Sequence, residues 1–499
     1  MARAWGRTDA HGINGRRLGS SGAYAVVSFP SPAWRQYGQN LYAATGNTIV
    51  RGLPMQRLGA FLRTYWTRGL PGRPTPKSVD KLMLRWWLVA LACKLLGSSW
   101  DVSWHFKWLR DDLAPPHLLN TVGTGIAIVL VLTYSITGYG VDKLSLRIIQ
   151  WGTGIFLIAA PIDVINHRVN GLDLTAWSPS HAMLYFGTAV MIAGIIRLWY
   201  LRYPRENTAS WAIGLTALFA FFFENAHFAQ LQQEYGILEI ASWFRGSAYA
   251  EGELLNFAAG QLGRPVDAIS LEKFALPIPP WVYPIWALVV CVPILVLARH
   301  MVGKFWTATA ITGGYVLYRA VTLPLLVAGS FPPSVPPVWL VGVGVLVDAL
   351  FLVRAHAYLR AVLGGVLVTA GGYGALWLQN VVSGTPTDLA YKPIEQVEAA
   401  YAAGAGDPLR FPPVDYASLW WALPGAVATW LLITYAAQRW LGFGTPRPPA
   451  GAVKYAAEPA RGKNGYLMGA PAALAGSHIP VKRPGRPVKQ SAQPRAKSR

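Results

Sequence analysis

The chain has 499 residues, of which 53% are hydrophobic and 13% are charged, whereas a soluble protein carries roughly a quarter charged residues. This composition excludes an ordinary soluble globular protein and indicates a membrane protein. The two cysteines exclude a disulfide framework and a cysteine-based metal or haem attachment site.

The net charge of +21 is confined to the two ends of the chain. Residues 1–81 hold twelve Lys and Arg and two acidic residues, and residues 439–499 hold twelve Lys and Arg and one acidic residue. Basic flanks mark the cytoplasmic side of a membrane protein, and anionic lipid attracts each basic residue by about 1 kcal/mol. We therefore expect two cytoplasmic segments, 1–80 and a disordered tail 439–499, that face lipid headgroups and not nucleic acid.

Ten apolar stretches of about 20 residues, the length needed to cross a bilayer, follow one another along the chain. Each is predicted to be a helix, because backbone in lipid must form its hydrogen bonds within the segment. The stretches are 82–102, 118–138, 146–166, 181–200, 209–229, 281–299, 305–328, 337–354, 359–380 and 418–438. The predicted fold is an all-α, polytopic helix bundle in the plasma membrane, with both termini in the cytoplasm.

These spans divide into a five-helix domain over residues 81–230, an outer loop over 231–280 and a second five-helix half over 281–438. Short loops on the side of the tails are basic, and the long loops 231–280 and 383–417 are richer in acidic residues. The long loops are therefore expected on the extracytoplasmic side. No adequate apolar run follows Arg16 and Arg17, so no signal peptide is expected.

One pattern occurs twice in the first five spans, as DVSWHFKWLRDDLAPPH from Asp101 to His117 and as DVINHRVNGLDLTAWSPSH from Asp163 to His181. In each copy a His follows the Asp by four positions, which places both side chains on one helical face. The second His opens the next helix behind a proline, and Ser178 is a candidate N-cap.

Both copies fall at the extracytoplasmic ends of their helices, where unpaired ionisable groups are costly and are candidates for function. Two imidazoles and one carboxylate form the facial ligand set typical of copper, zinc or iron with open positions. The predicted metal ligands are Asp101, His105, His117, Asp163, His167 and His181.

Two further pairs of ionisable residues lie within predicted spans. Glu224 and His227 are adjacent on one helical face and are additional candidate ligands, the alternative being that they satisfy each other. Arg319 and Asp348 are expected to form a structural pair within the second half, the alternative being a substrate path.

At the repeated pattern the sequence resembles the C subunit of the copper-containing membrane monooxygenases, the particulate methane and ammonia monooxygenases. The resemblance covers roughly residues 82–230 and implies two neighbouring copper sites, one at each copy of the pattern. It departs from the family in a first His–His gap that is one residue shorter and in Asp163, which stands where the family has Asn. The later helices and the basic tails have no counterpart, so the family's substrates are not carried over.

The residues and the resemblance together predict a copper-dependent monooxygenase subunit that works with membrane partner subunits and oxidises a small apolar substrate with O2. Zinc and iron are the alternative metals. The alternative functions are a non-enzymatic membrane protein for copper handling or assembly, and a subunit that transfers electrons through haem or quinol.

Overall fold

The computed structural model describes residues 63–109, 113–170, 175–202, 209–383, 393–404 and 414–440, without the side chains of 167–170, 202 and 440. These residues form helices and no strand, and nine of the helices are long and apolar enough to span a membrane. The protein is thus an all-α, multi-pass helix bundle. The predictions for residues 1–62 and 441–499 lie outside the described residues.

The first five predicted spans are confirmed as helices, and most of them extend beyond the predicted bounds. They are α3 (Lys77–His105), α4 (Pro115–Thr137), α5 (Lys143–Asn170), α6 (Pro179–Arg202) and α7 (Ala209–His227). The predicted cap of α6 is present, since the backbone N–H of His181 donates to Ser178 Oγ at 3.2 Å. Helices α3 and α4 form one hairpin, α5 and α6 form a second, and α7 packs against α3 and α6.

Many of the side chains exposed on these helices are large and apolar. On α4 and α5 they include Val129 at 61%, Ile158 at 59% and Trp151 at 71% exposure. Contiguous exposed apolar surface is rare on soluble monomers, and the buried polar residues instead face the interior of the bundle. The outward faces therefore fit contact with the lipid of a bilayer.

Glycines allow the two helices of each hairpin to approach closely, as small residues do in membrane bundles. A Cβ at Gly97 of α3 would lie 2.8 Å from the backbone N of Asn120 in α4. A Cβ at Gly187 of α6 would lie 2.7 Å from the backbone N of Phe156 in α5. These contacts fix the spacing of the helices that carry the two copies of the repeated pattern.

The substitution Gly123→Ala in α4 is expected to destabilise the protein by about 1–3 kcal/mol, the usual cost of overpacking a core. Its Cβ would lie 2.7 Å from the carbonyl oxygen of Ala90 and 2.9 Å from Lys94 Cγ. The matched control is Gly125→Ala in the same helix, where nothing lies within 4 Å. Thermal unfolding in detergent should show a loss for the first variant and none for the second; equal losses would contradict this packing.

Asp142 stabilises the turn between α4 and α5, outside the membrane-spanning segments. Its Oδ1 accepts hydrogen bonds from the N–H groups of Leu144 at 3.1 Å and Ser145 at 3.2 Å, and pairs with Arg197 at 2.6 Å. Burial alone would raise the pKa of Asp142, but the hydrogen bonds from Ser145 and Arg197 hold the pKa below its usual value.

Asp142→Ala is expected to lower stability at neutral pH by about 1–2 kcal/mol, the value of a helix cap. A carboxyl whose pKa is lowered by folding contributes in full above its unfolded pKa and loses that contribution as the pH falls through its folded pKa. Unfolding temperatures of the wild type and the variant, measured from pH 7 downward, should therefore converge on the acid side. A difference in unfolding temperature that stays constant with pH would show that the carboxylate charge does not contribute to stability.

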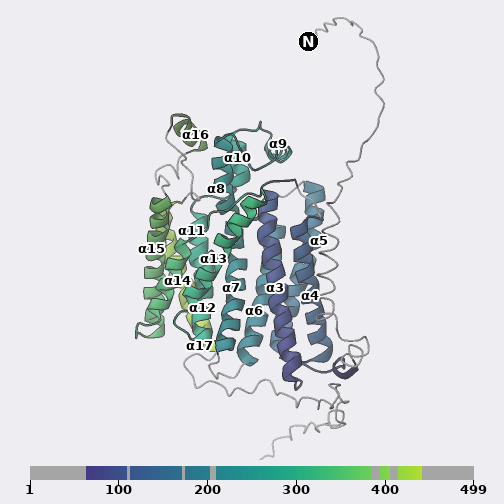
Figure 1. Ribbon diagram of the computed structural model, residues 1–499. Helices are drawn as coiled ribbons and strands as arrows, with labels where there is room; N and C mark the ends of the chain where they lie inside the picture. The colour runs from purple at the N-terminus through teal and green to yellow at the C-terminus, as the bar shows by residue number, and fades with distance from the viewer. Residues whose placement is uncertain are drawn as a thin grey trace, which may run out of the picture. The chain divides into compact units, whose positions relative to one another are not determined.

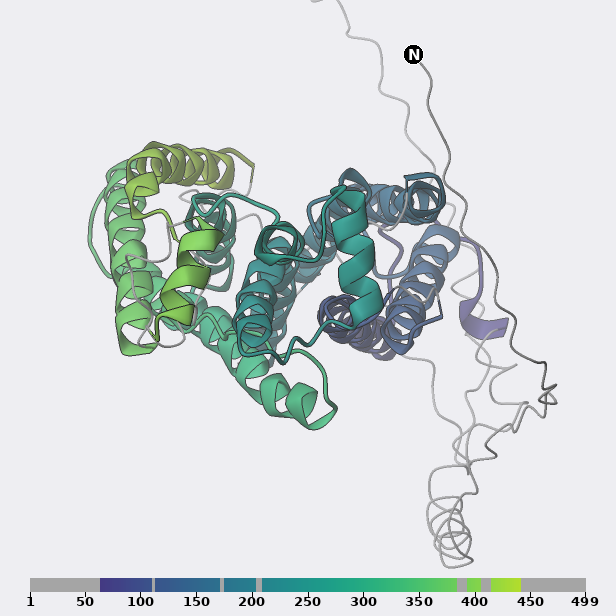
Figure 2. The same ribbon diagram turned by 90° about the horizontal axis from the view of Figure 1, so that it is seen from above.

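The second half supplies the remaining helices: α11 (Val282–Trp286), η2 (Ala287–Cys291), α12 (Val292–Val302), α13 (Thr307–Ala328), α14 (Trp339–Leu350), α15 (Ala357–Ser383), α16 (Ile394–Ala402), η4 (Tyr416–Ser418) and α17 (Leu419–Trp440). Helices α11, η2 and α12 form one span with a π-helical turn before Pro293, a residue that lacks the N–H of a regular helix. In the end-on view the α3–α6 helices (purple to blue) and the green helices lie on opposite sides of teal helices (Figure 2). Contacts of α7 with α3, α6, α12 and α13 account for this order.

The predicted span 337–354 needs correction. The helix found there, α14, has 12 residues, about 18 Å at 1.5 Å per residue, and a bilayer core is about 30 Å thick. The prolines at 332, 333, 336 and 337 prevent helix formation before it, and residues 331–338 run as non-helical chain with Ser334 only 2% exposed. Other parts of the protein form hydrogen bonds with the polar groups of this backbone. Ser103 Oγ donates to the Pro332 carbonyl at 2.8 Å, and the Val335 N–H donates to the Glu234 carbonyl at 3.0 Å.

The segment 231–280, expected as a loop, contains three helices: α8 (Leu231–Phe244), α9 (Gly252–Gln261) and α10 (Ala268–Ala275). Helix α8 continues from α7 through a single 3-10 turn, η1 (Phe228–Gln230). Helices α8, α9 and α10 gather with α16 at one end of the long helices (Figure 1). Their shared apolar core includes Phe106 at the end of α3, so this cap covers the end of the bundle where the repeated pattern lies.

Candidate metal centre

The first copy of the pattern brings its three predicted ligands together. Asp101 and His105 lie one turn apart at the end of α3, and His117 lies in the first turn of α4. Asp101 Oδ1 lies 2.7 Å from His117 Nε2 and 3.5 Å from His105 Nε2. One ligand atom of each residue lies within 4.8 Å of the other two, and this is the only such group of three among the residues that the structure describes.

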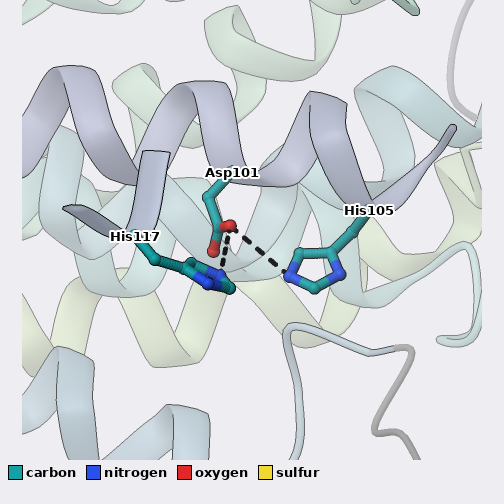
Figure 3. Close-up of side chains that lie close together, drawn as sticks. All are labelled: Asp101, His105 and His117. Carbon is teal, nitrogen blue, oxygen red and sulfur yellow. Dashed lines mark ion pairs between the residues drawn. The ribbon is translucent and has the colours of Figure 1, made fainter. Parts of the chain in front are cut away.

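Both imidazoles turn one nitrogen toward the carboxylate (Figure 3). Asp101 Oδ1 is buried, and the two imidazoles are the groups that face it, with His117 Nε2 the nearer at 2.7 Å. The three side chains are 19–27% exposed and therefore accessible from outside the bundle. A carboxylate flanked by two imidazoles can form ion pairs with them, and the same three groups could hold a metal ion among them.

The second copy is brought together in part. Asp163 Oδ1 in α5 lies 3.4 Å from His181 Nε2 in the first turn of α6. His181 Nδ1 donates to the carbonyl oxygen of Thr175 at 2.8 Å, which fixes the tautomer and leaves Nε2 as the acceptor or ligand atom. Helix α5 continues through His167, but its side chain lies outside the described residues, so the third member of this set stays a prediction.

One cavity of about 180 Å³ connects the two sets. Asp101, His105 and His117 line it together with Asp163 and His181. Apolar side chains from α3, α5, α6 and α7 line the wall together with several polar ones, and Gln232 of α8 and Phe274 of α10 lie at the capped end. Gln232 Oε1 accepts the Ala176 N–H at 2.7 Å, and Gln232 Nε2 donates to the Phe274 carbonyl at 3.3 Å. These hydrogen bonds hold the loop before α6 against the cap at this end of the cavity.

The sequence reasoning missed Lys94, which lines the same cavity and is 5% exposed. It is a charged residue within the predicted span 82–102, which is itself a signal of function. It also precedes Asp101 by seven positions, a spacing that repeats along one helical face and would have placed both residues on the same side of α3.

Glu224 and His227 do not satisfy each other. Glu224 lines the cavity, whereas His227 is fully buried and places Nε2 2.9 Å from Glu234 Oε1. Tyr283 donates to the same Glu234 oxygen at 2.8 Å. The geometry brings neither residue into the Asp101–His105–His117 group, so a role for Glu224 and His227 as metal ligands stays a prediction.

The expected pair of Arg319 and Asp348 is wrong, because each residue has another partner. Arg319 NH1 lies 3.0 Å from Glu234 Oε2 of α8, with both side chains at most 2% exposed. Asp348 pairs with Arg299 at 2.9 Å and accepts the Thr309 N–H at 2.8 Å. Arg319 therefore joins α13 of the second half to α8, the helix that continues from α7, and Asp348 stabilises the start of α13.

No protein-family model matches the chain, and no curated protein and no solved structure matches it. The resemblance to the membrane monooxygenase subunit therefore depends on the residues of the repeated pattern alone.

Proposed function

We propose that the chain is a membrane metal-dependent monooxygenase subunit that holds copper at Asp101, His105 and His117. The convergence of these three ligand atoms within 4.8 Å at one wall of a cavity carries the proposal. Asp163 and His181, on another wall of the cavity, are the proposed second site together with His167. The resemblance to the copper enzymes favours copper over zinc and iron, which suit the same donors.

Two imidazoles and a carboxylate fit a metal that keeps open positions, and copper bound there would supply activation of O2. The protein's own residues hold and orient that metal. Asp101 and His105 are fixed on α3, His117 is fixed in the proline-led first turn of α4, and Gly97 sets the spacing between these helices. The apolar walls admit a small apolar substrate, and the α8–α10 cap keeps bulk water from one end of the cavity.

The positive flanks described above support an extracytoplasmic position for this site in the plasma membrane. Partner subunits in the membrane would complete the enzyme and deliver electrons.

The accessibility of the first set also suits the second candidate function, a copper-handling protein that passes its metal on. Haem is disfavoured, because a cavity of about 180 Å³ is smaller than ligand pockets of about 300 Å³ and more.

The test uses membranes that contain the chain, supplied with a quinol reductant, ¹⁸O2 and butane as an apolar probe. The proposal expects copper with nitrogen hyperfine coupling from two imidazoles in the electron paramagnetic resonance spectrum, and ¹⁸O in the alcohol product. Asp101→Ala should lose the ¹⁸O transfer and the part of the copper signal that belongs to the Asp101 site. Copper with this coordination but no ¹⁸O transfer would favour the copper-handling function, and copper retained unchanged in Asp101→Ala would reject the site.

A further inference from the structure

Lys94 places its amino group in the cavity, two helical turns before Asp101 on α3, and is 5% exposed. Its Nζ donates to Asn120 Oδ1 at 3.0 Å and to Thr124 Oγ1 at 3.3 Å, and it lies 3.6 Å from the centre of the Phe156 ring. An ammonium group carries three N–H donors, and these acceptors take two of them. The third N–H donor of Lys94 is therefore not used by these acceptors, and the Lys94 side chain lines the cavity.

The amino group of Lys94 has no carboxylate partner in the described part of the chain. Asp101, Asp163 and Glu224 line the same cavity, but no carboxylate lies within 4.0 Å of Lys94 Nζ among the residues that the structure describes. Both side-chain acceptors are neutral. An ammonium group inside an apolar bundle is costly unless it is paired, so an anion that reaches Lys94 Nζ would stabilise the charged form of this side chain.

The surroundings of Lys94 narrow the class of anion. Leu91, Leu95, Phe156 and Ile192 line the cavity beside it, and such a wall disfavours a strongly hydrated, multiply charged ion such as phosphate. Since an engineered cavity of about 150 Å³ holds benzene, a cavity of about 180 Å³ has room for a chain of several carbon atoms. A singly charged carboxylate on a short apolar chain matches both the charge and the wall.

We propose that the Lys94 end of the cavity binds the carboxylate of a small aliphatic acid. Asn120 lies one turn after His117 and donates to Ser98 at 3.4 Å while it accepts from Lys94, so it stands between Lys94 and the Asp101–His105–His117 group. An acid held at Lys94 directs its apolar end along the cavity. That this end reaches the reacting metal rests on the proposed function; the carboxylate site itself does not.

Hexanoate binding to the full chain in lipid nanodiscs, measured by isothermal titration calorimetry without added metal, tests the site. Hexanoate should bind at least tenfold more tightly than 1-hexanol, a comparison that needs no variant. Lys94→Met should lose this preference, and Lys94→Arg should retain it. His105→Ala, which removes a proposed metal ligand, should still bind hexanoate, so a failure of the metal site is distinguishable from a failure of this one. Equal binding of hexanoate and hexanol to the wild type, or unchanged hexanoate binding in a folded Lys94→Met, would overturn the proposal.

Discussion

His105→Ala and His117→Ala are each expected to weaken copper binding by at least 100-fold. Loss of a partner that only orients a ligand costs about 10–100-fold in affinity, and each substitution removes one of three protein donors itself. Because the two imidazoles approach the same Asp101 oxygen from different helices, neither variant leaves a set that closes around a metal. Competition against a chelator of known affinity measures the change in each purified variant.

The matched control is His300→Ala, since His300 lies in α12 and packs on Phe351, away from the cavity. It should bind copper as the wild type does. His181→Ala separates the two sets, because it should remove metal from the Asp163 site and leave the Asp101 site loaded. Unchanged affinity in both His105→Ala and His117→Ala, with folding intact, would mean that this group is only a structural ion pair.

Arg319→Met is expected to lower the free energy of unfolding by about 3–5 kcal/mol, the cost of leaving a buried charge without its partner. Glu234, which is fully buried, would keep only the hydrogen bonds of His227 and Tyr283. The double variant Arg319→Met/Glu234→Gln should be less destabilised than Arg319→Met alone, because it removes both charges. Chemical denaturation in mixed micelles measures all three proteins.

Arg264→Met provides the control for Arg319. Its partner is Asp267 at 2.8 Å on the α9–α10 loop, where both side chains are at least one-third exposed. Solvent screens such a pair, so this variant should unfold with the wild type. If Arg319→Met were as stable as Arg264→Met, the buried pair would not contribute to the packing of α13 on α8.

Local sequence patterns predicted those features that depend on neighbours along the chain. The Asp101–His105 spacing, the prolines before His117 and the cap at Ser178 each act within one helical turn, and each has the expected geometry. The length of the apolar stretches likewise located the membrane spans. The short α14 also had a local signal in the prolines around Ser334, which hydropathy alone overlooks.

Features that depend on tertiary packing were not predictable in this way. Arg319 and Glu234 are joined only because α13 packs on α7 and α8 continues from it, and no periodicity encodes that contact. The helices in 231–280 were not predicted for a related reason. They are stabilised by an apolar core that they share with α3 and α16, and not by the length of an apolar stretch. The position of Lys94 within a predicted span indicated a functional residue, but only the cavity places it with the proposed metal ligands.

The pairing of Glu234 with Arg319 has a consequence for biosynthesis. Glu234 lies on the helical segment 209–244, which is made before the spans at 282–302 and 307–328 exist. A chain is synthesised from its N-terminus, so this carboxyl group enters the membrane before its guanidinium partner has left the ribosome. Until the later spans arrive, the partner of Glu234 on the same segment is His227, 2.9 Å away, and Arg319 completes the set when α13 packs against it.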